Sequence, residues 1–271
     1  MNIVEKKISY TFSSDPARGA YAITDNGASF SVNLNYPLAL PKTTKYATIE
    51  VHSASIWYVS PNISAALGNN IFSYWDGGNL LTFTIADGLY NFPQLVAAIA
   101  LTADSQPAPP STPFLQQFRF FADDPTQRTA IQFLAPIGPY INWVVGGMWQ
   151  VFGFTLGSTT GPVVPNTVIF GNTQAEFNIL NQYLIQSDLV HTGIPVNSNQ
   201  TNVLTTVYID VPPGSQLNFQ PTQPQICNAD ELIGGTRTNF RFFLTDQNNR
   251  PIDTFGEYWS FIITIRYFIP V

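Results

Sequence analysis

The stretches Phe118-Arg119-Phe120-Phe121-Ala122-Asp123 and Phe240-Arg241-Phe242-Phe243-Leu244-Thr245-Asp246 are nearly alike and lie just under half of the 271-residue chain apart. Each is followed by a second arginine, at Arg128 and Arg250, and then by an apolar run. Aromatic residues alternating with other residues are typical of a strand with one buried face. The two stretches therefore predict strands in equivalent positions of a repeated β unit.

Two weaker matches upstream keep the same order along the chain. Residues 84–92 resemble residues 209–219, because both contain a strand end, a glycine turn and an Asn-Phe pair. Residues 70–72 resemble residues 202–204 in the same relative order. The spacing between matched positions drifts steadily, which is expected of a duplicated unit whose loops have changed length.

The repeat predicts two similar β modules in tandem. We assign residues 1–157 to the first module and residues 158–271 to the second. The junction falls in residues 158–165, which are rich in Gly, Thr and Pro and contain no charged residue. Segments of this composition are common between domains.

Strand-like segments occur almost throughout the chain. Residues 260–268 carry apolar groups on both faces, which predicts a central strand buried on both sides. Asp76-Gly77-Gly78-Asn79 predicts a hairpin, because Asp-Gly and Gly-Gly supply the positive φ of tight turns. The one clear helix of the first half spans residues 92–101, with Pro93 in its first turn. Further strands are predicted at 7–12, 30–36, 46–59, 71–75, 80–85, 114–121, 130–134, 203–211, 216–219 and 240–244.

This pattern of many strands and Gly/Pro turns is typical of sandwiches and barrels. An eight-stranded jelly roll needs about 80–90 residues, from strands near six residues and loops near five. Two such units fit within 271 residues and leave room for insertions. The predicted fold class is therefore all-β: two tandem eight-stranded jelly rolls, a double jelly roll, with one or two short helices.

The composition is low in charge and rich in aromatic residues. Charged residues make up 10% of the chain, against about 25% in an ordinary soluble domain. A neutral surface suits a chain that packs against neighbours in a large assembly, and also suits a secreted β protein. The net charge of −6 argues against sequence-specific nucleic-acid binding. Lys6, Lys7 and Arg18 come nearest to a basic arm for lipid headgroups or genome, although two lysines more often only solvate a terminus.

Cysteine usage and the N-terminal sequence bear on the compartment. Cys227 is the only cysteine, so an intrachain disulfide is excluded. Residues 1–7 lack the apolar core of a signal peptide, and no apolar run approaches the length of a membrane span. We therefore expect synthesis in a cytoplasm, and we interpret the sequons at Asn62 and Asn199 as accidental.

No motif of a catalytic or metal site is present. His52 and His191 are the only histidines, and neither stands with other ligands at the spacing of a metal site. No nucleophile elbow, phosphate loop or dinucleotide fingerprint occurs. We expect no catalytic, cofactor-binding or metal-binding residues. Turn formation accounts for the carboxylates at or near turns, namely Asp87, Asp123, Asp124, Asp210, Asp246, Asp253 and Glu257.

A carbohydrate-binding β-sandwich, either a lectin or a glycosidase, stays open as an alternative. A glycosidase needs two carboxylates that converge in a cleft beside aromatic platforms. The candidate acids are Glu176, Glu231 and Glu257, but nothing in the sequence brings them together. The turn 76–79 could also bind calcium, although a plain hairpin accounts for it. The candidate platforms are Trp57, Trp75, Trp143, Trp149 and Trp259.

The segment Ile85-Ala86-Asp87-Gly88-Leu89-Tyr90, followed by the helix at 92–101, resembles the strand-and-helix insertion of jelly-roll capsid proteins. The apparent duplication, the length and the low charge resemble the double-jelly-roll viral major capsid proteins. That family includes adenovirus hexons and the capsid proteins of tailless membrane-containing bacteriophages. The resemblance spans the chain in architecture and rests on no diagnostic motif.

The resemblance implies a structural virion protein without catalytic function. Its partner would be itself, in homotrimers with a pseudo-hexagonal outline that tile an icosahedral shell. Penton and minor capsid proteins would be further partners, and an internal viral membrane is another candidate. Assembly would take place inside the host cell, and residues 102–113, 153–165 and 191–201 would form outer loops or subunit contacts. A single-jelly-roll penton or minor capsid protein is the nearest alternative within the same viruses.

Overall fold

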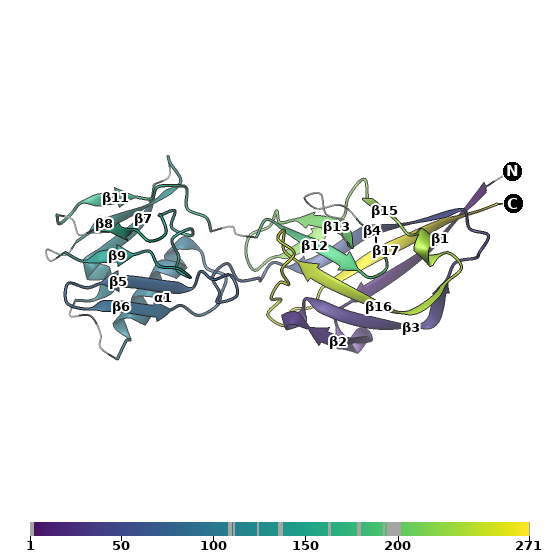
Figure 1. Cartoon of the computed structure of the whole chain (residues 1–271), viewed down its shortest axis with the longest axis horizontal. Coiled ribbons are helices and arrows are strands. Elements are labelled where there is room, and N and C mark those ends of the chain that lie inside the picture. The colour runs from purple at the N-terminus through teal and green to yellow at the C-terminus, as the bar shows by residue number, and fades with distance from the viewer. Residues whose placement is uncertain are drawn as a thin grey trace. The chain divides into compact units, whose positions relative to one another are not determined.

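The computed structural model describes residues 3–107, 110, 112–123, 125–134, 138–161, 164–177, 180–191, 193 and 202–270 (Figure 1). The chain divides into two compact units. Unit 1 combines Met1–Ser60 with Leu180–Val271, and unit 2 is Pro61–Ile179. Unit 2 is thus an insertion within the sequence of unit 1.

The first sheet of unit 1 is built around the long strand β4 (Tyr46–Trp57). This strand pairs with β17 (Ser260–Pro270), which pairs in turn with β1 (Ile3–Ser13). On its other edge β4 pairs with both β14 (Gln216–Phe219) and β15 (Ile226–Asn228). The order is β1-β17-β4-β14, and every pairing is antiparallel.

The second sheet of unit 1 is also antiparallel. Its order is β13 (Val203–Tyr208), β12 (Gln182–Ser187), β16 (Thr236–Thr245), β3 (Ser29–Ala39) and β2 (Ala20–Thr24). Three short 3₁₀ turns lie in the connections of unit 1: η1 (Pro16–Arg18), η2 (Asp25–Gly27) and η3 (Asp230–Leu232).

The strand order of unit 1 is that of a jelly roll. Going along the chain, β1, β4, β14 and β17 belong to the first sheet, while β3, β12, β13 and β16 belong to the second. The chain therefore crosses between sheets at almost every connection, and the two termini pair side by side in one sheet. If the additional strands β2 and β15 are set aside, four strands remain in each sheet, and with these crossings they form one complete eight-stranded jelly roll. The predicted all-β jelly-roll class is confirmed.

Aromatic side chains fill the space between the two sheets of unit 1. Phe12 of the first sheet lies 4.5 Å from Phe242 of the second, between ring centroids. Phe30 and Trp259 make an edge-to-face contact at 5.0 Å. All four side chains are buried. Such ring pairs contribute about 0.5–1.5 kcal/mol each beyond the area they bury, so they hold the two sheets face to face.

Unit 2 contains two smaller antiparallel sheets and the helices. One sheet has the order β10 (Thr159–Thr160), β9 (Tyr140–Asn142), β5 (Ile71–Trp75) and β6 (Leu80–Thr84). The other has the order β11 (Val168–Phe170), β8 (Arg128–Phe133) and β7 (Phe118–Asp123). Their shared core includes Phe72, Tyr74, Phe114, Phe118, Phe133, Trp143 and Phe152.

Helix α1 (Phe92–Asp104) covers part of this core, as its sequence predicted. Asn91 caps it: its Oδ1 accepts from the Gln94 backbone N–H at 2.9 Å, and Gln94 Oε1 accepts from the Asn91 N–H at 3.0 Å. Such capping boxes satisfy two N–H groups that the first turn leaves free. Leu95 and Ile99 turn the apolar side of the helix into the core.

Several predictions about local structure need adjustment. The stretch 114–121 was predicted as one strand, but Phe114–Gln117 forms the short helix α2 before β7 begins. β17 is central in its sheet, as predicted, but one of its faces is only partly buried: Thr264 on that face is buried, whereas Ile262, Arg266 and Phe268 are partly exposed. Among the described residues, neither helix has both the length and the apolar character needed to cross a bilayer.

The predicted tandem modules, residues 1–157 and 158–271, are wrong as a description of the domains. The strands before residue 60 and after residue 180 pair with each other, as β1 does with β17 and β3 with β16. The predicted junction at 158–165 lies inside unit 2, where Thr159–Thr160 forms β10. One jelly roll with an inserted unit replaces the predicted pair of consecutive jelly rolls.

The two similar stretches that suggested duplication occupy different positions. The stretch 118–123 forms β7, at the edge of a three-stranded sheet of unit 2. The stretch at 240–246 lies largely in β16, between β12 and β3 in the centre of a unit 1 sheet. Any strand that buries one face in an aromatic core favours this alternation. The sequence similarity of the two stretches therefore reflects a similar local environment and not an equivalent position in a repeated fold.

Candidate interaction surface

The outer face of the first sheet is the side turned away from the second sheet. Residues at alternate positions share this face, because successive side chains of a strand point to opposite sides. Ile8, Ile265 and Ile49 point inward, so their neighbours along each strand point outward. We define the outer face by Glu5, Lys7, Ser9, Thr11, Tyr46, Thr48, Glu50, Ser55, Trp57, Gln216, Ile226, Ile262, Thr264, Arg266 and Phe268.

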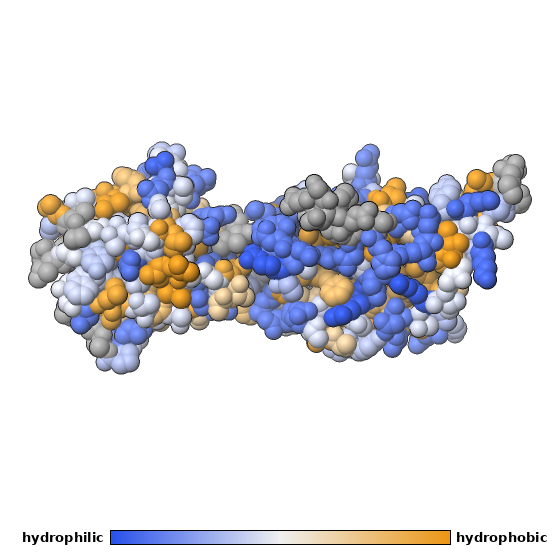
Figure 2. All heavy atoms as spheres, in the orientation of Figure 1, coloured by the Kyte–Doolittle hydropathy of each residue, from blue (hydrophilic) through white to orange (hydrophobic). Residues whose placement is uncertain are grey.

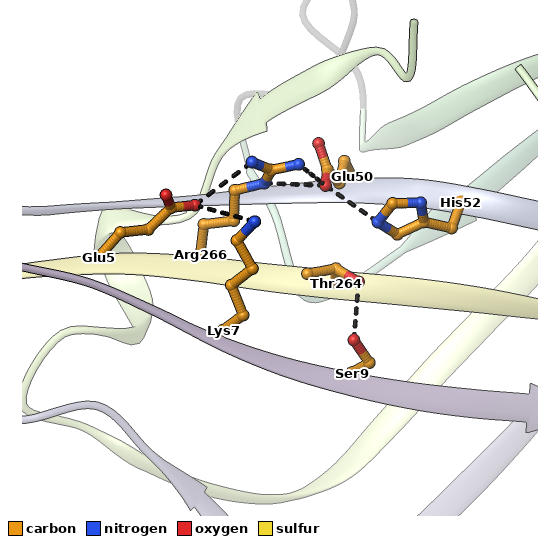
Figure 3. A network of polar contacts seen from close by, with 7 residues as sticks. All are labelled: Glu5, Lys7, Ser9, Glu50, His52, Thr264 and Arg266. Carbon is orange, nitrogen blue, oxygen red and sulfur yellow. Dashed lines mark hydrogen bonds and ion pairs between the residues drawn. The ribbon is translucent and has the colours of Figure 1, made fainter. Parts of the chain in front are cut away.

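Arg266 is the centre of a polar network on this face (Figure 3). Its Nε donates to Glu50 Oε1 at 2.9 Å, and its Nη2 donates to the same oxygen at 2.5 Å. Its Nη1 reaches Glu5 Oε1 at 3.3 Å. One guanidinium on β17 therefore joins a carboxylate on β1 to a carboxylate on β4. The planar fork of arginine suits such a role, because its donors point in several directions at once.

Further polar contacts extend the network across the three strands. Lys7 Nζ lies 3.5 Å from Glu5 Oε1, and His52 Nε2 lies 3.1 Å from Glu50 Oε1. The hydroxyls of Ser9 and Thr264, which face each other across β1 and β17, are 2.8 Å apart. Figure 3 shows these side chains on one side of the sheet.

Glu50 is buried although it points toward solvent. Its side chain is 4% exposed, while that of Arg266 is 31% exposed. A carboxylate this well covered needs a charged partner, because transfer of a lone charge out of water is costly. The hydrogen bonds that Arg266 donates to Glu50 raise the pKa of the Arg266 guanidinium, although desolvation opposes them. The forked contact holds the two side chains in one geometry.

Apolar and aromatic side chains lie on the same face. Ile226, beside Glu50 in the register, is 65% exposed, and Trp57 is 36% exposed. Tyr46 stacks on Phe268 with ring centroids 4.1 Å apart. Strands of up to 12 residues, at about 3.3 Å per residue and about 4.8 Å apart, give this face roughly 700 Å². Stable interfaces bury about 800 Å² per partner, so the face is of the right size for a protein contact.

The two histidines each face a glutamate, which sequence reasoning missed. His52 contacts Glu50, and His191 Nε2 lies 3.1 Å from Glu231 Oε2. No group of three or more His, Cys, Asp or Glu side chains suited to a metal ion occurs within the described ranges. Cys227, the lone cysteine, is buried and faces backbone carbonyls of β13. The position of Glu50 two residues before His52 in one strand was the available sequence signal.

Most predicted turn carboxylates do accept turn hydrogen bonds. Asp76 Oδ1 accepts from the N–H groups of Gly78 and Asn79 at 2.8 and 2.6 Å, which makes the segment an ordinary hairpin turn. Asp246 Oδ1 accepts from the N–H groups of Asn248 and Arg250 at 2.8 Å. Asp87, Asp123 and Asp253 accept comparable local or loop hydrogen bonds. Asp124 and the sequon at Asn199 lie outside the described residues.

The candidate parts of a sugar site are not brought together. Trp143 and Trp259 are buried and have no free face for a sugar ring. Trp75 stacks on Tyr140 with centroids 6.2 Å apart. Glu231 lies in η3 beside the start of β4, whereas Glu257 precedes β17 at the opposite end of unit 1. Glu176 belongs to unit 2.

Comparison with known proteins adds to this description. The sequence matches no protein-family model and no curated protein. The fold is similar to a solved structure, the crystal structure of the selenomethionine-labelled mavirus penton protein. The TM-score is 0.53 at 12% sequence identity, and the match covers 97% of this chain and 100% of that chain. The similarity in fold therefore extends over nearly the whole chain and is not confined to the jelly roll of unit 1.

Proposed function

We propose that this chain is a structural subunit of a viral capsid, of the penton type, in which five copies form a ring at a vertex of the shell. The earlier expectation of a major capsid protein needs two jelly rolls in each chain. Unit 1 supplies one, and unit 2 has a different strand order. The penton alternative needs only one.

The coverage of the structural match is the single observation that carries this proposal. If the two proteins shared only a jelly roll, the structural alignment would cover unit 1 and leave unit 2 unaligned. Here the match covers 97% of this chain and the whole of the penton protein, so it includes the inserted unit as well. A jelly roll with a matching insertion is a more specific resemblance than the jelly roll alone.

The outer face supports a role in subunit packing. Arg266 already joins Glu5 and Glu50, so covering the face leaves neither carboxylate without a partner. This matters because an unpaired charge buried in an interface costs several kcal/mol. Trp57 and Ile226 provide apolar anchors of the kind that contribute most to binding. We assign this face to the contact between neighbouring copies of the chain.

The role follows from assembly and requires no reaction. Its partners would be further copies of the chain and the neighbouring capsomers, and its location would be the virion. No catalytic residue, cofactor or metal is part of the proposal.

Negative-stain microscopy of the purified chain tests the proposal. Rings with fivefold symmetry are the expected result. Threefold particles with a hexagonal outline would instead favour a major capsid protein. Isolated monomers that bind defined sugars on a glycan array would favour the carbohydrate-binding alternative and overturn the proposal.

A further inference from the structure

All four lysines of the chain lie at one end of unit 1. Lys6 and Lys7 are near the start of β1, while Lys42 and Lys45 are in the connection from β3 to β4. The backbone N–H of Lys45 donates to the carbonyl of Phe268 at 2.8 Å. Phe268 pairs with a residue of β1, so the two pairs of lysines are neighbours across the sheet. We call this region, with its four exposed lysines, the lysine end.

The opposite end of unit 1 is acidic. Among the residues that the structure describes at this end, the cations are Arg18 and Arg250, and each is paired with an aspartate, at 3.7 Å and 2.8 Å respectively. The acidic groups there lie in or beside the turns between strands, and a hydrogen bond of 3.1 Å from Asn26 to Asp253 joins two of these turns. They are Asp15, Asp25, Asp210, Asp246, Asp253 and Glu257. Although the net charge of the chain is negative, unit 1 therefore has a lysine-rich end and an acidic end.

The carboxylates that do lie at the lysine end are largely engaged. Glu5 contacts Lys7 and Arg266. Asp230 accepts from the Ala47 N–H at 2.7 Å, and Glu231 accepts from the His191 N–H at 2.9 Å. Within the described part of the chain, by contrast, Lys6, Lys42 and Lys45 belong to no ion pair. Their ammonium groups are free to meet an external anionic surface.

Exposed apolar and aromatic side chains surround these lysines. Tyr36 is 86% exposed and Ile3 is 54% exposed, and Val4 and Tyr46 also reach the surface. Figure 2 shows hydrophobic residues beside hydrophilic ones at the end of unit 1 that carries the termini. Lysines around aliphatic and aromatic groups suit the headgroup region of a bilayer, where charge stays wet and apolar groups insert. Nucleic acid would leave the aliphatic groups without a partner.

We propose that the lysine end of unit 1 docks onto the surface of an anionic lipid bilayer. The lysines would contact the headgroups, while Ile3, Val4 and Tyr36 would enter the interface. A lysine near an anionic membrane strengthens binding by about fivefold. This inference goes beyond the proposed function and does not depend on it, since a chain that forms no ring could still bind lipid.

Co-sedimentation of the full chain with lipid vesicles tests the proposal. We expect binding to vesicles of phosphatidylcholine mixed with phosphatidylserine, little binding to phosphatidylcholine alone, and loss of binding at high salt. Lys6→Gln/Lys7→Gln and Lys42→Gln/Lys45→Gln should each weaken binding about 25-fold. The control Arg18→Gln/Arg241→Gln removes the same charge away from the lysine end and should bind like the parent chain.

The apolar side chains need a second pair of variants. Ile3→Ser/Val4→Ser keeps every charge and should also weaken vesicle binding, whereas Tyr208→Ser, on an exposed site of β13, should not. Circular dichroism will show that each variant is folded. Equal binding to neutral vesicles, an equal loss in the arginine control, or tighter binding to a nucleic acid of mixed sequence would each overturn the lipid assignment.

Discussion

Arg266 and Glu50 are 216 positions apart in sequence, yet they form a forked contact in which Nε and Nη2 both donate to one carboxylate oxygen. The contact exists because β17 and β4 are neighbours in the first sheet of the jelly roll. It also allows a buried carboxylate to remain on the outer face of that sheet. The same face holds the apolar residues that we assign to subunit packing.

Arg266→Met should destabilise unit 1 by about 2 kcal/mol, because it leaves the buried Glu50 carboxylate without its charged partner. The double variant Arg266→Met/Glu50→Gln should lose less than the two single variants added together, since no unpaired charge then remains. Lys7→Met is the matched control, and its exposed pair with Glu5 should be worth under about 0.5 kcal/mol. Denaturant unfolding measures the stability of Arg266→Met, Glu50→Gln, the double variant and Lys7→Met. Additive losses would contradict the assigned coupling.

Removal of the hydroxyl from two buried tyrosines should change stability in different directions. The Tyr74 hydroxyl is buried and has no hydrogen-bond partner among the described residues, so Tyr74→Phe should leave unit 2 as stable or up to about 1 kcal/mol more stable. The Tyr183 hydroxyl lies 3.2 Å from the Ser60 hydroxyl. Tyr183→Phe should therefore cost unit 1 about 1 kcal/mol. Thermal unfolding of both variants at neutral pH checks this, and a clear loss for Tyr74→Phe would contradict the account.

Stability should fall in alkaline solution. Burial raises the pKa of Tyr74 and of Tyr183 well above the usual value. The folded state therefore holds two protons that the unfolded chain releases near about pH 10. The stabilisation is fully present below that pH and is lost as the pH rises above it. Unfolding free energies measured from about pH 8 to about pH 11 should fall less steeply in Tyr183→Phe, and an unchanged slope would argue against this cause.

Alanine substitution at two glycines in one loop of unit 2 distinguishes the stability cost of steric overlap from that of backbone strain. Gly153 and Gly157 have the same φ of 73°. A Cβ at Gly153 would overlap the Thr173 carbonyl oxygen and lie 3.0 Å from that of Gln174, whereas a Cβ at Gly157 would meet nothing within 4 Å. Gly157→Ala should cost about 1 kcal/mol from strain alone, and Gly153→Ala about 3 kcal/mol from strain plus overlap. Equal losses of stability in thermal unfolding would show that the close packing of Gly153 against the Thr173 and Gln174 carbonyls adds no cost, and would contradict this prediction.

Local patterns predicted much of the secondary structure. The hairpin of β5 and β6 and the capped helix α1 follow from residues near one another in the chain, namely Asp76-Gly77-Gly78-Asn79 and Asn91 to Gln94. The division of the chain into two units could not be predicted from such local patterns. Whether β1 pairs with a strand of the first half or with β17 depends on contacts about 250 residues apart, and alternation specifies a buried face but not its partner.

The candidate surface was missed for the same reason. Glu5, Glu50 and Arg266 are unremarkable charged residues within strands until the sheet order brings them together. A carboxylate and a histidine two residues apart, at Glu50 and His52 of one predicted strand, were the local sign. The four lysines likewise come from two distant segments, and only the fold shows that these segments end at the same place.

The mass of the assembled particle tests the central claim most directly. Native mass spectrometry of the full chain should give five copies at micromolar concentration, and Trp57→Asp/Ile226→Asp should reduce this to monomers because it places charges on the outer face. Tyr208→Asp, which puts one charge on the other sheet, should leave five copies. A parent chain that stays monomeric, or five copies that persist in the Trp57→Asp/Ile226→Asp variant, would contradict the account.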